Sequence, residues 1–455
     1  MAAPLLALLV VLVWLKPQEW SEPLAGLPLL ELTSLGVAVA IALERSLGGA
    51  RIVVPRGAAL ACAFAAIAMV SRLLSSGTFE LARALKPLVV LVAIASAIAI
   101  GASSLRALAW VAGGILVASA FVATVAVGQG MAPFGCAMQE GDALDALRPD
   151  GRSCAIPRDC EEGGEPGARY QCERVGWLGT LSVGGGRVRY RGVLKDPNEL
   201  ALAVAASAPF AIEAARRRAR GGPWVLATAY LALATTVVLW TRSRGGLLVL
   251  AAALGTIGVV RWGRKAAALA AVAGVVALAV AGRGGEEADA SSAERSELLG
   301  AALRMFGERP LLGVGFDRFK DHAPLTAHNA YALALAEVGL AGFALFLLWI
   351  AWSVVVAVRI LERHGPLPEA AEAVSLARSI LASLVATLVG GFFLSVTYHQ
   401  LVWIALALAA ALDGAVRRHD PAFRVELSCR ELAWVAALAL GFPLALFAFV
   451  RIRGV

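Results

Sequence analysis

Charged residues are scarce in this chain. Asp, Glu, Lys and Arg together make up 16% of its 455 residues, whereas soluble globular proteins contain about 25%. The hydrophobic fraction is 59% and the mean hydropathy is +0.75. The shortage of charge excludes an ordinary soluble domain, and the excess of apolar residues indicates a protein that crosses a membrane several times.

The long apolar runs also lack alternation of polar and apolar residues. Because backbone groups in lipid must be hydrogen-bonded internally, only helices and closed barrels can span a membrane, and runs without period-two alternation select helices. The first run has neither the basic segment nor the cleavage site of a signal peptide, so we interpret it as a retained helix. We therefore predict an all-α, polytopic helical membrane bundle of 12 or 13 spans, with candidate spans at 3–16, 23–43, 55–72, 86–102, 106–128, 198–214, 223–240, 245–261, 265–282, 329–358, 376–397, 399–416 and 432–450.

The net charge of +8 gives no indication of nucleic-acid binding. The basic residues cluster in short loops between spans, where they set membrane topology. The positive-inside rule places five such loops on the cytoplasmic side, at 44–56, 213–220, 261–265, 359–364 and 417–424. The opposite side then carries two large inserts, 128–195 and 282–327, and the short turn 241–246.

This pattern divides the chain into five parts. They are N-terminal transmembrane helices (1–128), an external loop with four cysteines (129–195), transmembrane helices that include a TRSRGG turn (196–282), a second external loop (283–328) and C-terminal transmembrane helices (329–455). A polar insert as long as the second loop, between apolar runs, indicates catalysis or docking at that face of the membrane.

No pair of cysteines is spaced as CxxC. Four of the six cysteines, Cys136, Cys154, Cys160 and Cys172, lie in the first external loop. An oxidising compartment such as the periplasm would join them in two disulfides, with three possible connectivities. A zinc site is the competing interpretation, which the spacings do not favour.

Two arginines stand in the TRSRGG turn. Arg242 and Arg244 lie at the external end of a predicted span, whereas membrane topology favours basic residues on the cytoplasmic side. They could be interfacial residues whose charged ends reach water. Two guanidinium groups in a tight turn also suit a phosphate or pyrophosphate, because each presents a planar fork of donors.

The segment 293–307 predicts an amphipathic helix lying on the membrane. Its apolar stripe contains Arg295, while Arg304 faces away. A guanidinium on a buried face needs an anionic partner. The alternative is that Arg295, near the start of the helix, bends outward. The stripe itself consists of Leu298, Leu299, Ala302, Leu303 and Phe306.

His328 and Asn329 precede the span that follows the second loop. A neutral imidazole is a natural proton acceptor near neutral pH, although a lone interfacial histidine is more often a structural hydrogen-bonding group. His322 lies in a charged stretch that looks solvated. Glu337 lies deep in the next span and needs a partner that the sequence does not identify.

The string KDPNEL predicts a helix start. Asp196 as N-cap, Pro197 at the first helical position and Glu199 form a capping box, which needs no ligand. In the preceding RVRYR, the arginines 187, 189 and 191 share one face of an extended strand. That face could bind anionic headgroups or acidic sugars, but we favour a solvated hairpin.

Four strings in this order resemble the O-antigen ligase and O-antigen polymerase superfamily of bacterial membrane glycosyltransferases. They are GVLKDPNELAL, TRSRGGLL, ERSELLGAALRMFGERPLLGVGFDRF and AHNAYALALAEVGLAG, and they cover about 191–347. The cysteine-bearing segment 136–172 lies outside the resemblance. The opening LKPQEW and PLAGLP are similar to members associated with exopolysaccharide synthesis.

The resemblance implies a fold similar to other polyprenyl-dependent membrane glycosyltransferases. It also implies metal-independent transfer, without a cofactor, at the periplasmic face of the bacterial inner membrane. The donor would be a glycan linked to undecaprenyl pyrophosphate, and the acceptor a glycan or lipid A-core. Arg244 and Arg295 would hold the pyrophosphate and His328 would be the general base. We further expect Arg242, Arg191 and Asn329 to contact substrate.

Several functions remain compatible with this pattern. A ligase would attach finished glycan to lipid A-core, and a polymerase would extend one carrier-linked chain with another; the N-terminal strings favour a polymerase. Protein glycosylation is a third possibility for the acceptor. The alternative class is a polysaccharide flippase or other transporter, which tends to show internal repeats and charges near the membrane midplane. The sequence shows no repeat between its halves.

Overall fold

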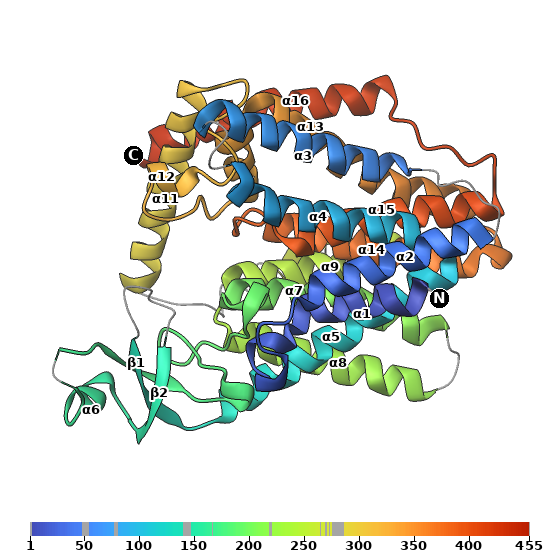
Figure 1. The fold of residues 1–455 in the computed structure, drawn as a ribbon. Helices are drawn as coiled ribbons and strands as arrows, with labels where there is room; N and C mark the ends of the chain where they lie inside the picture. The colour runs from blue at the N-terminus through green and yellow to red at the C-terminus, as the bar shows by residue number, and fades with distance from the viewer. Residues whose placement is uncertain are drawn as a thin grey trace.

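A computed structural model of the chain describes residues 2–47, 54–76, 81–139, 147–165, 167–217, 221–263, 265–268, 271–272, 274 and 286–454. Most of these residues form a bundle of long helices, and a small β-containing lobe projects from one end of it (Figure 1). The N-terminus lies at the opposite end of the bundle from this lobe. The fold is the predicted polytopic helical bundle.

Twelve of the thirteen predicted spans coincide with helices. The remaining one, 265–282, lies largely outside the described residues. Among the described helices, nine are long and apolar enough to cross a membrane, α4 has a shorter apolar part, and α2 and α7 are not among the nine. The twelve are α1 (Ala2–Leu15), α2 (Leu29–Leu47), α3 (Arg56–Ser76), α4 (Leu81–Gly101), α5 (Leu105–Met131), α7 (Pro197–Arg217), α8 (Gly221–Trp240), α9 (Arg244–Trp262), α13 (Ala330–His364), α14 (Ala371–Gly390), α15 (Gln400–His419) and α16 (Cys429–Arg453).

One predicted span is too long. The span 376–397 was expected to continue through GGFFLSV, but α14 ends at Gly390 and residues 391–399 form turns and irregular chain. The segment is apolar because it packs inside the protein, not because it is helical. Leu394 and Val396 are both buried there. This irregular segment, 391–399, is called the α14–α15 connection below.

Hydrogen bonds and ion pairs join the described parts of the basic loops at one end of the bundle. Arg418 donates from Nη2 to Ser103 Oγ at 2.7 Å, and Arg217 Nη1 lies 3.2 Å from Glu372 Oε1. The polar inserts lie at the other end (Figure 1). We call these the basic end and the loop end. The predicted separation of the two sets is present, and the assignment of the loop end to the periplasm stays a prediction.

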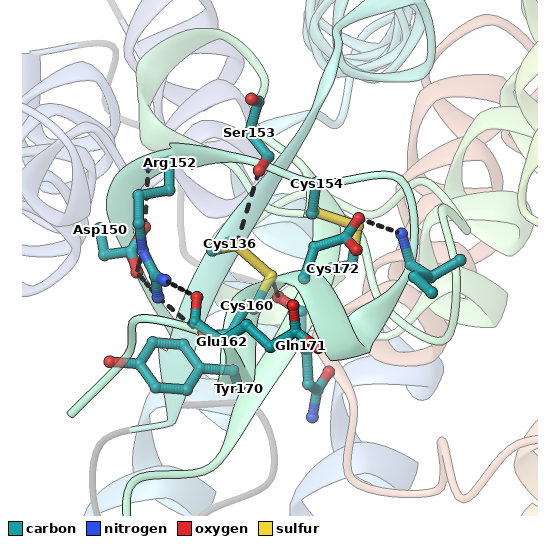
Figure 2. The surroundings of a disulfide bond; sticks show 12 residues. Cys136, Asp150, Arg152, Ser153, Cys154, Cys160, Glu162, Tyr170, Gln171 and Cys172 are labelled. Carbon is teal, nitrogen blue, oxygen red and sulfur yellow. Dashed lines mark hydrogen bonds and ion pairs between the residues drawn. A yellow bond between two sulfur atoms is a disulfide. The ribbon is translucent and has the colours of Figure 1, made fainter. Parts of the chain in front are cut away.

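The first insert forms the projecting lobe. Strands β1 (Phe134–Gln139), β2 (Leu147–Ser153) and β3 (Tyr170–Arg174) make an antiparallel sheet in the order β2-β1-β3. The short helix α6 (Pro157–Glu161) connects β2 to β3 in the sequence. The predicted disulfides are present and join Cys136 to Cys160 and Cys154 to Cys172 (Figure 2). Three of these sulfur atoms lie within 4.8 Å of one another, which would suit a zinc ion. Because all three are in disulfides, no thiolate is left to bind one.

The prediction of a solvated RVRYR hairpin is wrong. Arg189 is only 8% exposed, and its Nε donates to Leu181 O at 2.9 Å. Arg187 Nε donates to Thr241 O at 2.9 Å, which ties the segment to the TRSRGG turn (241–246). Arg191 donates to the carbonyls of Glu19 and Gly179. The arginines therefore hold the first external loop against the ends of the spans.

Candidate active site

His328 is held in place by the start of α13. Asn329 is the N-cap of this helix, and its Oδ1 accepts hydrogen bonds from the backbone N–H groups of Tyr331 at 3.0 Å and Ala332 at 2.9 Å. His328 adopts a left-handed backbone conformation with φ of 48°. Such a conformation is uncommon outside glycine and persists only where the surrounding structure holds it. The imidazole is half-buried at the loop end.

Charged groups from several elements surround this imidazole. Burial lowers the pKa of His328, and the positive charge of Arg295 lowers it further. Asp196 and Glu294 act in the opposite direction, and Lys320 acts with Arg295. These groups come from the start of α7, from α11 (Glu286–Glu308) and from α12 (Phe319–His322). The imidazole of His328 is consequently neutral near pH 7.

The helix α11 bears out the predicted difference between two arginines. It crosses the direction of the spanning helices at the loop end (Figure 1) and packs against α13 and α16. Leu298 and Ala302 are buried, Arg295 is half-buried on the same side, and Arg304 is exposed. The buried face is centred on Leu298, Ala301, Ala302 and Met305, so the outer part of the predicted stripe is only partly covered.

The TRSRGG turn connects α8 and α9. Arg242 has a left-handed backbone with φ of 49°. Ser243 caps α9 by accepting a hydrogen bond from the N–H of Gly246 at 2.9 Å. Arg244 is the first residue of α9, and both arginine side chains are exposed. The start of a helix favours an anion, because its free N–H groups and its dipole are both positive.

Contacts with the α14–α15 connection bring this turn toward the start of α13. A methyl group added at Gly245 would lie 3.1 Å from Cβ of Phe393. The preceding residue, Phe392, accepts a hydrogen bond from Asn329 Nδ2 at 3.2 Å. The TRSRGG turn and the start of α13 therefore flank the same dipeptide. Both glycines of the turn serve close packing, since a methyl group at Gly246 would lie 2.6 Å from Cβ of Ala201.

Two residues predicted to contact substrate have structural roles. The Oδ1 of Asn329 is occupied by capping α13, and its amide nitrogen donates to the α14–α15 connection. Arg191 donates to two backbone carbonyls. That either residue contacts substrate stays a prediction. By contrast, Arg242 makes no side-chain hydrogen bond or ion pair within the described part of the chain.

Sequence reasoning missed a backbone pairing beside the site. The helix α13 is broken at Gly339, which has φ of 62° and ψ of −168°. The segment 310–315 lies along this break. The N–H groups of Val314 and Gly315 donate to the carbonyls of Ala336 and Glu337 at 2.9 and 3.0 Å. In the other direction, the N–H groups of 340 and 341 donate to the carbonyls of 310 and 311 at 2.8 and 3.1 Å.

Glu337 supplies the anchor of this pairing. Its Oε1 accepts a hydrogen bond from the backbone N–H of Phe319 at 2.9 Å, which identifies the partner that the sequence left open. Ser71 of α3 donates to Leu312 O at 2.5 Å and to Glu337 O at 2.7 Å. The carboxyl group thus holds the end of the second external loop against α13. A lone acid within an apolar run was the only sequence signal of this arrangement.

The comparison with known proteins bears on this part of the chain. Residues 229–347 match the family model described as O-antigen ligase. No curated protein matches the chain. The matched residues extend from α8 into α13 and include the TRSRGG turn, Arg295 and His328. The segment that carries the candidate site is therefore similar to the O-antigen ligase family.

Proposed function

We propose that this protein is a bacterial inner-membrane glycosyltransferase that moves a glycan from undecaprenyl pyrophosphate to a sugar hydroxyl at the periplasmic face. The observation that supports this most is the pair formed by His328 and Arg295. Burial and the charge of Arg295 lower the pKa of His328, so the imidazole is free to take a proton. Both residues lie in the segment that matches the O-antigen ligases.

In the proposed reaction, the acceptor hydroxyl attacks the anomeric carbon of the donor. His328 removes the hydroxyl proton as the new C–O bond forms, and the bond from the anomeric carbon to the pyrophosphate breaks. Negative charge then builds on the leaving pyrophosphate. Arg295 and Arg244 stabilise this charge, and Arg242 adds a third guanidinium group. A base opposite the leaving group predicts inversion at the anomeric carbon, which linkage analysis of the product tests.

The effect of Arg295 on His328 couples donor binding to the basicity of the imidazole. Without donor, the charge of Arg295 lowers the pKa of His328. A pyrophosphate bound to this guanidinium would neutralise its charge, and the pKa of His328 would then rise toward its ordinary value. The histidine would become a stronger base when the donor is in place. The guanidinium groups do the electrostatic work that a divalent cation performs in other phosphate-transferring enzymes, so a chelator should leave the rate unchanged.

The broken helix α13 does not favour the transporter alternative. Transporters use unwound backbone to coordinate ions or substrate in a cavity. Here the freed carbonyls of Ala336 and Glu337 already accept hydrogen bonds from the segment 310–315. The break is therefore filled by the protein's own backbone.

Transfer by the purified protein tests the proposal. Reconstituted protein would receive a polyprenyl-pyrophosphate-linked glycan and an acceptor, and the release of carrier would be measured. We expect His328→Ala to lower the rate about 10²- to 10⁴-fold, the usual contribution of a general base. His322→Ala is the matched control, because this exposed histidine lies in the same loop. Equal rates for the two variants would contradict the proposed role of His328.

The glycan profile of a deletion strain separates the possible acceptors. We favour polymerisation of an exopolysaccharide or O-antigen. A polymerase predicts that chain length is lost while single units still reach their acceptor. Long carrier-linked glycan with bare lipid A-core would instead indicate a ligase. Carrier-linked single units retained on the cytoplasmic side would indicate a flippase.

A further inference from the structure

A cavity of about 410 Å³ lies at the basic end of the bundle, where α1, α2, α4, α5 and α15 meet. This is the end opposite the candidate active site (Figure 1). The cavity is mainly polar, and the proposed transfer reaction makes no use of it. The side chains that matter here are Glu44, Arg45, Ser103, Arg106, Trp110 and Arg418.

Positive charge is in excess in this cavity. Arg45 and Arg418 both donate to the hydroxyl oxygen of Ser103, at 3.2 and 2.7 Å, so two guanidinium groups converge on one neutral group. Arg106 is a third, and within the described part of the chain it makes no hydrogen bond or ion pair. Glu44 is the one carboxylate in the lining, and it accepts a hydrogen bond from the backbone N–H of residue 2 at 2.8 Å. Like charges held this close favour a bound anion.

An apolar groove continues from this cavity. It has a volume of about 530 Å³, runs between α1 and α5, and shares Arg106 and Trp110 with the cavity. Leu8 and Val117 line it and are 46% and 65% exposed on the outer surface of the bundle. At Gly113 an added methyl group would meet no atom within 4 Å, so the missing side chain leaves open space.

The length of the groove matches one leaflet of a membrane. From Arg106 to Val117 the helix α5 rises about 17 Å, at about 1.5 Å per residue. The hydrocarbon core of a bilayer is about 30 Å thick, so one leaflet contributes about half of this. The groove starts beside basic residues at the bundle's end and stops near its middle. A chain lying in it would belong to the leaflet on the basic side.

We propose that the cavity and the groove together bind an anionic phospholipid, with its phosphate among Arg45, Arg106 and Arg418 and one acyl chain between α1 and α5. Guanidinium forks suit phosphate oxygens, and basic pockets between transmembrane helices bind acidic headgroups. A free phosphate would share the headgroup chemistry but would not use the groove. The proposal does not depend on the transfer reaction, because it concerns the other end of the bundle.

Lipid binding by the full-length protein in a neutral detergent tests the proposal. Native mass spectrometry and the thermal unfolding midpoint would be followed during titration with phosphatidylglycerol, phosphatidylcholine or glycerol phosphate. We expect half-saturation by phosphatidylglycerol at a concentration roughly tenfold lower than by phosphatidylcholine, which corresponds to about one charge-assisted hydrogen bond. Equal affinity for the two lipids would overturn the proposal. Glycerol phosphate binding as tightly as the lipid would assign the cavity to a soluble ligand and overturn the lipid assignment.

Variants separate the two parts of the site. Arg106→Gln should weaken binding of phosphatidylglycerol roughly tenfold with little effect on the unfolding midpoint without lipid, since Arg106 makes no hydrogen bond or ion pair with any described residue. Gly113→Leu should fill the groove and weaken binding of both lipids. Arg430→Gln is the control, because this exposed arginine starts α16 at the same end. A loss with Arg430→Gln as large as that with Arg106→Gln would show unspecific attraction and sink the proposal.

Discussion

Two arginines on α11 make a matched pair for testing the site. Arg295 is half-buried and its charge acts on His328, whereas Arg304 is exposed on the same helix. Each is replaced by alanine in an otherwise unchanged chain. Both variants replace arginine by alanine in the same helix, so the change in helix propensity is the same in each. The comparison isolates what the location of the guanidinium contributes.

The expected magnitudes differ by orders of magnitude. Removing one preorganised donor from a site that stabilises developing negative charge costs about 2.7–4 kcal/mol in the transition state, or roughly 10²–10³ in rate. We expect a loss in this range for Arg295→Ala. An exposed charge contributes about 0–1 kcal/mol, which is less than about fivefold. Arg304→Ala should therefore retain most of the activity.

Initial rates of carrier release in proteoliposomes measure both variants, with the amount of reconstituted protein determined for each. Arg295→Lys adds a further comparison, because it keeps the charge but removes the planar fork that binds a phosphate bidentately. Its rate should lie between those of the native chain and Arg295→Ala. Equal losses for Arg295→Ala and Arg304→Ala would refute the argument from the buried face of α11.

Three further outcomes are expected. Because burial lowers the pKa of His328 in the donor-free protein, kcat/KM should persist below pH 6.5 and fall only when the base becomes protonated at lower pH. The pH profile of kcat/KM measures this, and an acid limb above pH 6.5 would contradict it. Replacing Cys136 and Cys160 by alanine removes a disulfide between residues 24 positions apart. The loop-closure entropy model predicts that the free energy of unfolding of the lobe falls by about 3.5 kcal/mol, which should appear as faster limited proteolysis. Gly313→Ala should lower the thermal midpoint, because its methyl group would lie 2.3 Å from backbone of α13, while Gly307→Ala, with no atom within 4 Å, should not.

Hydrophobicity located the spans but not every helix end. The runs that became α5 and α13 are long and apolar, and polar residues lie at their ends, so their sequence is sufficient to locate them. The α14–α15 connection is just as apolar, and the prediction extended a helix through it. Hydropathy reports that a segment avoids water, and it does not distinguish a helix in lipid from irregular chain packed between helices.

At the site, helical periodicity predicted correctly which residues are buried, whereas burial that depends on long-range contacts could not be predicted. The placement of Arg295 and Arg304 follows from the helical repeat, which is a local property of the sequence. The burial of Arg189 does not, since its acceptor is a carbonyl that only the fold brings near. Asp196 shows both cases. Its capping role could be predicted from the local sequence, but the effect of its charge on the pKa of His328 could not, because His328 lies far along the chain.

Because the segment 310–315 pairs with the break in α13, the backbone groups at this break are not available to bind substrate. A helix broken inside a bundle frees carbonyl and N–H groups that must be satisfied by protein when water is absent. The glycines of LLGVG meet this need, because Gly313 allows the loop's backbone to reach that of α13 and Gly315 allows it to pass Ser75 of α3. Close packing likewise explains the two glycines of the TRSRGG turn. This close packing of glycines does not involve the exposed Arg244, the half-buried Arg295 or His328 with its φ of 48°. We propose that these three side chains bind an anion and transfer a proton, and the variants above test that role.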